Sequence, residues 1–363
     1  MGPIAASTAS RREGGKRRHT LTHGWMIGLM AAAAAFSSQA AHADEAGSSF
    51  WVPGLFGSLA AAPQVPGWNF TNFYYHTTVS GGSDVVFARE VPIGHLNIPF
   101  TSQVNAHLNA DADLDVLFPQ YVFATPVLGG QAAVGLLVPV GRMTATADAT
   151  LTAAVGPLGF TVGAGRTDES TGFGDPAPFA SLRWHDGVNN WMTYITGGIP
   201  VGEYSATSLA NLGLGHGSID AGGGYTYFNP ATGHEFSGVL GFTYNFINPD
   251  TQVQSGVDMH FDWGASQFLT KQWQIGIVGY VYDQLSCDSG SGNRVGCFES
   301  RVVGLGPQIG YIIPMGDLQG YLNLKAYGEF DAAHRPDGWN VWLTFAISHA
   351  PPTPASPSHL LTK

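Results

Sequence analysis

Polar and apolar residues alternate along several segments of the chain, and this alternation limits the folds that the chain can adopt. Over residues 104–118 every even position is apolar, and all but the last odd position are polar. Successive side chains point to opposite faces in a β-strand, so such a segment has one polar face toward water and one apolar face toward an apolar surrounding. The predicted strand is also longer than most strands of soluble domains.

Two later segments show the same pattern. Residues 257–263 place Asp258, His260 and Asp262 on one face and apolar side chains on the other. Residues 321–330 place Lys325 and Glu329 on the polar face. The outward face of a soluble β-sandwich usually carries more Lys and Glu than these strands do. Long strands with one apolar and one polar face, joined by turn residues, are typical of transmembrane β-barrels.

The composition agrees with a β protein in a membrane. Only 11% of the 363 residues are charged, against about 25% in an average soluble domain. Apolar residues make up 44% of the chain and aromatic residues 12%, which is too much for a disordered chain. After the first 43 residues, no apolar stretch is long enough for a transmembrane helix. The net charge of −11 argues against a nucleic-acid partner, because phosphate binding needs clustered Lys and Arg.

The N-terminus has the features of a secretory signal peptide. Five basic residues lie between positions 11 and 18, residues 25–36 are apolar, and Ala41-His42-Ala43 offers a cleavage site. We therefore expect residues 1–43 to be removed during export to the outer membrane of a Gram-negative cell. The paired arginines leave twin-arginine export as an alternative, although that route suits folded soluble proteins.

Turn signals divide the remaining chain into twelve strands. Five short connections lie at residues 128–130, 186–189, 229–233, 270–271 and 314–317, and six longer polar or Gly-rich stretches lie at residues 80–100, 142–171, 203–217, 248–255, 286–299 and 331–338. Outer-membrane barrels alternate short periplasmic turns and long extracellular loops in this way. We predict an all-β fold, a transmembrane antiparallel up-and-down β-barrel of about 12 strands over residues 68–348. Residues 349–363 are predicted to be a disordered Pro-rich tail.

The chain contains two cysteines, Cys287 and Cys297. In an exported chain, two cysteines so close together around a Gly/Ser-rich turn most simply form a disulfide. No His or further Cys lies nearby to complete four metal ligands, so a zinc site is not expected there.

Five short motifs carry a resemblance to a known family. They are TGFGDP at residues 171–176, PVGEY at 200–204, NPDT at 248–251 with Ser255-Gly256 after it, GYVYDQL at 279–285 and GLGPQIGY at 304–311. In this order and spacing, over residues 51–345, the chain resembles the bacterial outer-membrane proteins linked to the meta-pathway of phenol degradation. Members of that family are regarded as transporters of aromatic or other hydrophobic compounds. The resemblance therefore implies uptake rather than catalysis, and it assigns no substrate residue.

The alternation also predicts the side chains that line the lumen. A barrel of twelve strands is wider than one of eight, whose interior side chains fill, and narrower than an open porin, so we expect passive passage of a small solute. The lumen candidates are the polar faces: His107, Asn109, Asp111, Asp113, Asp115, Asp258, His260, Asp262, Lys325 and Glu329. The three aspartates at 111–115 would make the lumen acidic and favour cations. Alternatively, these carboxylates pair with Arg142, Arg183 or Lys325 and merely hydrate the wall.

Residues 44–67 precede the first predicted strand and are candidates for a lumen plug. Residues 50–57 are apolar without strand alternation, and Phe50, Trp51, Leu55 and Phe56 are the candidate plug residues. The segment either lies inside the barrel or forms a loose periplasmic lead-in.

Motifs for catalysis are missing from the sequence. No Gly-x-Ser-x-Gly elbow occurs, and the glycine run at residues 213–217 lacks the Lys of a phosphate loop. We expect no enzyme, no cofactor and no metal site. The expected partners are the lipid bilayer of the outer membrane, the outer-membrane assembly machinery and a small hydrophobic or aromatic solute. A structural or adhesive surface barrel, or an outer-membrane hydrolase, is the alternative.

Overall fold

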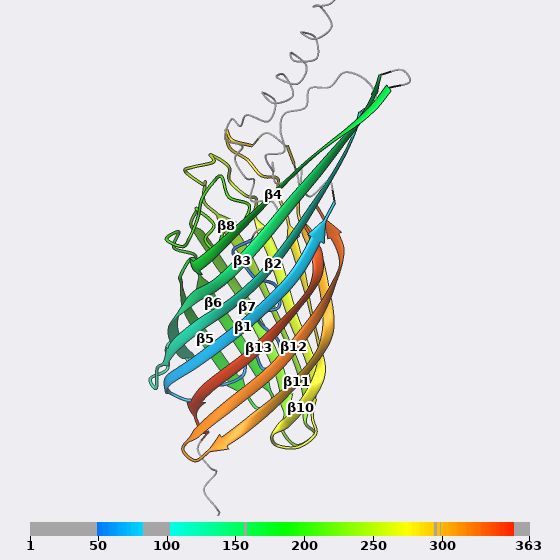
Figure 1. Cartoon of the computed structure of the whole chain (residues 1–363). Coiled ribbons are helices and arrows are strands. Elements are labelled where there is room, and N and C mark those ends of the chain that lie inside the picture. Colours follow the sequence, from blue (N-terminus) through cyan, green and yellow to red (C-terminus); the bar gives the residue numbers. More distant parts are fainter. Residues whose placement is uncertain (1–48, 83–101, 156–157, 294–295, 298, 352–363) are drawn as a thin grey trace, which may run out of the picture.

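The computed structural model describes residues 49–82, 102–155, 158–293, 296–297 and 299–351. One antiparallel sheet closes on itself between β1 (Gly67–Gly81) and β13 (Asp337–His349) (Figure 1). Between them lie β2 (Ser102–Val122), β3 (Gln131–Val155), β4 (Leu158–Phe173), β5 (Ala177–Asp186), β6 (Asn189–Thr196), β7 (Ser218–Asn229), β8 (His234–Asn245), β9 (Asp258–Phe268), β10 (Trp273–Gln284), β11 (Arg301–Met315) and β12 (Leu318–Ala333). The predicted signal peptide and residues 352–363 of the predicted tail lie outside the described residues.

The segments β4 and β5 are two parts of one wall strand. β4 pairs with β3 from Val140 to Val155, and β5 pairs with β3 from Gln131 to Leu137. Residues 174–176 interrupt the strand between the two parts. Counted in this way, the wall has twelve strands, each paired with its neighbours in sequence. The predicted fold, an antiparallel up-and-down barrel of about twelve strands, is confirmed.

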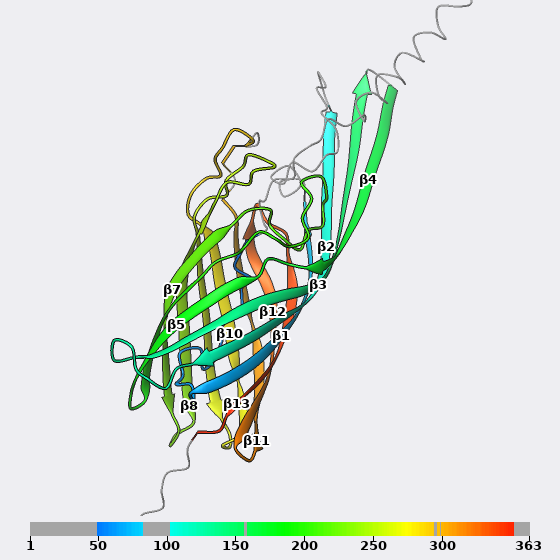
Figure 2. The same ribbon diagram turned by 90° about the vertical axis from the view of Figure 1, so that its left-hand side faces the viewer.

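Three strands, β2, β3 and β4, extend well beyond the rest of the barrel (Figures 1 and 2). The prediction of a loop over residues 142–171 is wrong, because β3 and β4 pair through most of it. This stretch is rich in Thr, Ala and Gly and therefore gives a weak hydrophobic signal. Its small side chains are nevertheless useful, because Ala145 and Ala147 pack in a buried cluster with Leu108 of β2 and with Leu209 and Ala210 of the loop before β7.

Large apolar side chains face outward on most of the wall. Examples are Trp191 and Ile195 on β6, Phe242 on β8, and Ile275 and Ile277 on β10, all of them more than two-fifths exposed. A soluble protein rarely exposes apolar surface on this scale, whereas lipid is a suitable surrounding for it. No helix in the described residues is long and apolar enough to cross a membrane.

The loops at one end of the barrel are tied to one another. Cys287 and Cys297 form a disulfide in the loop that joins β10 to β11. The same loop contacts the loop before β9, since Gly256 N–H donates to Asp288 Oδ1 at 3.0 Å. A bridge between Gln254 and Ser289 adds a second connection. The disulfide therefore stabilises a loop that also supports its neighbour.

Candidate functional site

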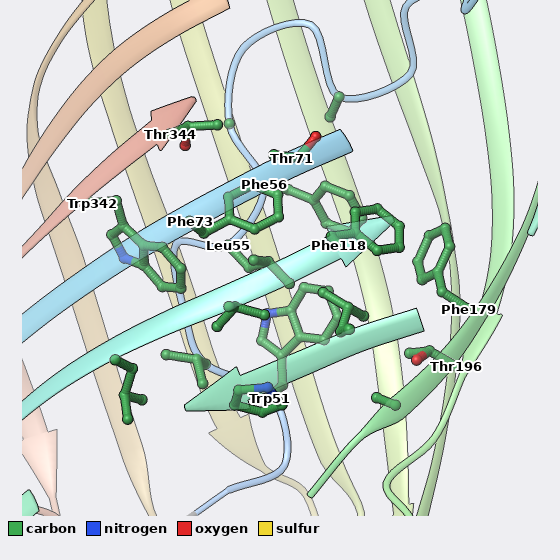
Figure 3. A pocket seen from close by; sticks show the side chains of 18 of the residues that line it. Trp51, Leu55, Phe56, Thr71, Phe73, Phe118, Phe179, Thr196, Trp342 and Thr344 are labelled. Carbon is green, nitrogen blue, oxygen red and sulfur yellow. The ribbon is translucent and has the colours of Figure 1, made fainter. Parts of the chain in front are cut away.

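Residues 49–66, here called the lumen segment, lie inside the barrel before β1 begins. Figure 3 shows part of this segment, with Trp51, Leu55 and Phe56 labelled among side chains of the wall. Trp51 and Ala61 are buried. The segment forms no strand, and only two of its backbone N–H groups, those of Leu55 and Ala62, donate to carbonyls within the segment among the described contacts. Side chains of the wall satisfy several of the others.

Asp262 on β9 is the principal acceptor for the lumen segment. Its Oδ1 accepts a hydrogen bond from Gly54 N–H at 2.8 Å. Its Oδ2 accepts from Trp51 Nε1–H at 3.1 Å and from Phe56 N–H at 3.4 Å. The carboxylate is buried, and a buried carboxylate needs several donors to offset its lost hydration. Here the lumen segment supplies three of them.

Lys325 on β12 binds the same turn through its carbonyl groups. The ammonium donates to the carbonyl of Gly54, and to those of Leu55 and Phe56 at 3.2 Å each. It also lies 5.3 Å from the ring centroid of Trp342. Gly54 has a φ of +88° and packs against Trp342, so a larger residue would be strained there. Opposite charges on two strands therefore hold one turn of the segment.

Further contacts anchor the rest of the lumen segment. Leu59 N–H donates to Glu235 Oε1 at 2.8 Å, Ala61 N–H to Thr226 Oγ1 at 2.9 Å, Gln308 Nε2–H to Ser58 Oγ at 2.6 Å, Gln64 Nε2–H to Gln120 Oε1 at 2.6 Å, and Arg183 Nη2–H to the Ala60 carbonyl at 3.1 Å. Most of these partners come from β7 to β12. Polar side chains of strands β7 to β12 therefore anchor much of the segment.

The Trp51 indole covers a buried polar pair. His260 Nε2 lies 3.0 Å from Asp220 Oδ2 and 3.3 Å from the Tyr194 hydroxyl, and both His260 and Asp220 are fully buried. Thr243 Oγ1–H donates to Asp220 at 2.6 Å. In the described part of the chain, no serine hydroxyl bonds to His260. The hydroxyl groups that lie next to this pair among the described residues are those of Tyr194 and Thr243.

An apolar cavity of about 340 Å³ separates the lumen segment from the opposite wall. The segment contributes Trp51, Val52, Leu55 and Phe56 to it. Strands β1, β2, β3, β5 and β13 of the wall contribute Phe73, Leu114, Val116, Phe118, Leu137, Pro139, Ala177, Phe179, Trp342 and Ala346. Figure 3 shows Phe73, Phe118 and Phe179 around this space. The lumen therefore has an apolar half and a polar half.

The predicted lumen face of β2 is wrong. His107, Asn109, Asp111, Asp113 and Asp115 are exposed on the outside, while the alternate residues Leu114, Val116 and Phe118 line the cavity. The three aspartates bond across to β1: Asp111 with Thr78 at 2.7 Å, Asp113 with Tyr74 at 2.7 Å and His76 at 2.8 Å, and Asp115 with Asn72 at 3.2 Å. Alternation defines two faces without saying which one points inward. Here the apolar face of β2 finds its apolar partners inside the barrel.

The other predicted lumen residues lie on inward faces. Asp258 accepts a hydrogen bond from Asn245 at 2.9 Å, and Glu329 accepts one from the Tyr280 hydroxyl at 2.6 Å. Of the three cations that were alternatives as partners of the aspartates, Arg142 lies opposite Asp113 in the pairing of β2 with β3, and its guanidinium is exposed and pairs with Glu169 at 2.9 Å. Arg183 and Lys325 both contact the lumen segment.

Sequence reasoning missed several residues of the site. Glu235 and Thr226 anchor the lumen segment, and Phe118 and Phe179 line the cavity. The alternation of β8, with Glu235 and Ser237 buried and Phe236 exposed, is a signal that could have placed Glu235 on the inside.

The closed sheet, the outward apolar side chains and the internal segment define a transmembrane β-barrel whose lumen is occupied by its own N-terminal region. The family model described as "Putative MetA-pathway of phenol degradation" matches residues 78–345, and the chain belongs to this family. The family resemblance expected from the five motifs is thus confirmed.

Solved structures show a similar fold. The COG4313 outer membrane channel from Pseudomonas putida F1 matches with a TM-score of 0.57 and 11% identity, over 79% of this chain and 97% of that chain. A FadL homologue from Pseudomonas aeruginosa matches with a TM-score of 0.38 and 9% identity, over 85% and 97% of the two chains. The first likeness supports the barrel fold, and the second is too weak to carry an argument. No curated protein matches the sequence.

Proposed function

We propose that this protein is an outer-membrane channel for the passive uptake of small hydrophobic or aromatic compounds. The observation that carries the proposal is the apolar cavity of about 340 Å³ inside the barrel. Ligand pockets are typically apolar and of a few hundred Å³, with a small number of polar groups at their edges. The family description, which refers to phenol degradation, and the channel of similar fold from Pseudomonas putida support the same proposal.

The structure of the lumen suggests how a channel of this kind would close. The lumen segment packs against β7 to β12 through hydrogen bonds, and its apolar side chains face the cavity. In our proposal it acts as a hatch, which detaches from the polar wall for a solute to pass. The buried carboxylate of Asp262 and the buried ammonium of Lys325 would then gain water in place of the hatch. Hydration of these two groups makes the open state energetically accessible, because neither the Asp262 carboxylate nor the Lys325 ammonium is then both desolvated and unpaired.

Transport is tested with the mature barrel in planar bilayers and in liposomes. We expect ion conductance that toluene alters, and toluene entry into the liposomes above that of protein-free vesicles. A silent membrane without solute entry would favour the structural or adhesive barrel. Turnover of a p-nitrophenyl ester, abolished when His260 is replaced by Ala, would favour a hydrolase.

The hatch is tested by deleting residues 50–57, which contain most of the contacts to Asp262 and Lys325. We expect a larger conductance and a greater leak of small ions. Folding of the shortened barrel is checked by gel electrophoresis in detergent, where a folded barrel that has not been heated migrates differently from the heated, unfolded chain. An unchanged conductance in a folded barrel would show that the segment does not obstruct the lumen.

A further inference from the structure

Arg183 on β5 is a cation of the lumen that has no anionic partner among the residues that the structure describes. It lines the apolar cavity together with Gln64 and Ala60 of the lumen segment. Its Nη1 donates to Gln64 Oε1 and, at 3.3 Å, to Ser181 Oγ, and its Nη2 donates to the Ala60 carbonyl at 3.1 Å. Within the described residues it forms no ion pair. All its acceptors are neutral.

Three other arginines, unlike Arg183, form ion pairs. Arg142, Arg166 and Arg301 pair with Glu169, Asp168 and Asp331 at 2.9, 2.7 and 3.1 Å. These three arginines are at least two-fifths exposed, where an ion pair contributes little. A cation in an apolar cavity has a far greater need of a countercharge, because water no longer hydrates it fully. The arginine that most needs an anion therefore has none from the described chain.

The Arg183 guanidinium is already arranged to accept an anion. Its Nε–H is buried and has no hydrogen-bond partner in the described part of the chain. Nε and Nη2 together form the edge of the guanidinium that binds a carboxylate through two parallel hydrogen bonds. In this structure one of these donors is unused, and the other holds the peptide carbonyl of Ala60.

Other residues that line the same cavity indicate the rest of the ligand. Phe118 and Phe179 line the same cavity, with their ring centroids 5.4 Å apart in an edge-to-face arrangement. Leu137 and Ala177 complete the apolar surface near them. A ligand here needs an apolar, ring-sized body and one anionic end.

We propose that the cavity binds an aromatic or similarly apolar monocarboxylate, with its carboxylate on Nε and Nη2 of Arg183 and its body against Phe118 and Phe179. This inference rests on the proposed function and names the solute class. Because Nε is closed to solvent, the carboxylate takes the place of the Ala60 carbonyl. The solute therefore competes with the lumen segment for Arg183, and its binding removes one anchor of the hatch.

The test compares benzoate with benzamide and toluene, which have the same ring and no charge. Binding is measured by calorimetry on the full mature barrel in detergent, for the wild type, for Arg183→Gln and for Arg183→Lys. We expect the wild type to bind benzoate about tenfold or more tightly than benzamide, since a charge-assisted pair is stronger than a neutral hydrogen bond. Arg183→Gln should lose this preference and still bind toluene, and Arg183→Lys should keep part of it.

The possible failures can be told apart. If wild type binds toluene and benzamide but shows no preference for benzoate, or if Arg183→Gln keeps the preference, the anion site is refuted and the apolar channel stands. If none of the three ligands binds or enters liposomes, the proposed function fails as well. Heat-modifiable migration on gels verifies that each variant is folded, so a loss of preference cannot come from an unfolded barrel.

Discussion

The indole of Trp51 stacks on the imidazole of His260, with ring centroids 3.8 Å apart and planes within 10° of parallel. The stack joins the lumen segment to β9, and the same indole donates to Asp262. One side chain therefore covers a buried polar pair and also supports the turn that Asp262 and Lys325 hold.

Replacing Trp51 by Ala should loosen the lumen segment. Truncating a buried aromatic side chain costs about 3–5 kcal/mol, and here the loss falls on the docking of the segment rather than on the wall. We expect more frequent or larger conductance steps in planar bilayers, with a barrel that resists unfolding as the wild type does. Trp191→Ala, on the lipid-facing side of β6, is the matched control and should conduct like the wild type. Equal conductance for both variants would contradict a role of Trp51 in closure.

A disulfide across the contact between Ser58 and Ser266 should lock the lumen segment in place. The two hydroxyl oxygens lie 3.3 Å apart, on the segment and on β9. With both residues replaced by Cys, oxidation should reduce toluene entry into liposomes, and a reductant should restore it. Because the reductant also reaches Cys287 and Cys297, the wild type with and without reductant is the necessary control. Undiminished entry through a fully oxidised double variant would exclude detachment of the segment as the opening step.

Filling the cavity should weaken solute binding without disturbing the lumen segment. Ala346 on β13 lines the cavity, and Ala346→Phe would occupy part of its volume. We expect weaker toluene binding by calorimetry. Leu343→Phe, which faces outward on the same strand, should bind toluene as the wild type does. Unaltered binding in Ala346→Phe would place the solute elsewhere in the barrel.

Neutralising the aspartates of β2 should leave ion selectivity unchanged. Asp111, Asp113 and Asp115 face outward and bond to β1, so they contribute little field inside the lumen. The triple variant with Asn at these positions is measured by its reversal potential in a salt gradient. A loss of cation preference in this variant would mean that the carboxylates face the conducting path after all.

Asp175 should be essential for order in the loop between β6 and β7. Its two carboxylate oxygens accept hydrogen bonds from Gly202 N–H and Leu214 N–H, each at 2.8 Å. Leaving these buried donors unpaired costs about 1–3 kcal/mol each. We expect Asp175→Ala to be cut by protease within residues 203–213 faster than wild type, and Asp175→Asn to lie between the two. Equal cleavage rates would show that other contacts hold the loop.

The sequence was most informative where lipid and lumen impose opposite chemistries on one strand. On β9 and β12 the inward face is the polar one, and the outward residues Phe261 and Leu324 are apolar. On β2 the same kind of alternation has the reverse orientation over residues 105–115, where the exposed face carries the polar side chains. Period two alone cannot distinguish these cases.

The contacts of the lumen segment lay beyond sequence reasoning for a different reason. Asp262 and Gly54 are 208 positions apart in the chain, and their contact depends on the closure of the whole barrel. The apolar side chains of residues 50–57 indicated a segment that has to be buried. They did not indicate which strands would bury it. The same holds for Arg183, whose neutral partners become visible only when β5 and the lumen segment lie together.

The outward face of β2 changes from polar to apolar between Asp115 and Leu117, whereas β8 already carries outward apolar residues from Phe236 to Tyr244. The apolar belt on the outside of the barrel is therefore shorter on the side of β2 than on the side of β8. Lipid acyl chains next to β2 therefore contact a shorter hydrophobic surface. The bilayer accommodates this mismatch by local thinning or by a tilt of the barrel. Such a tilt would incline the extension formed by β2, β3 and β4 relative to the membrane plane.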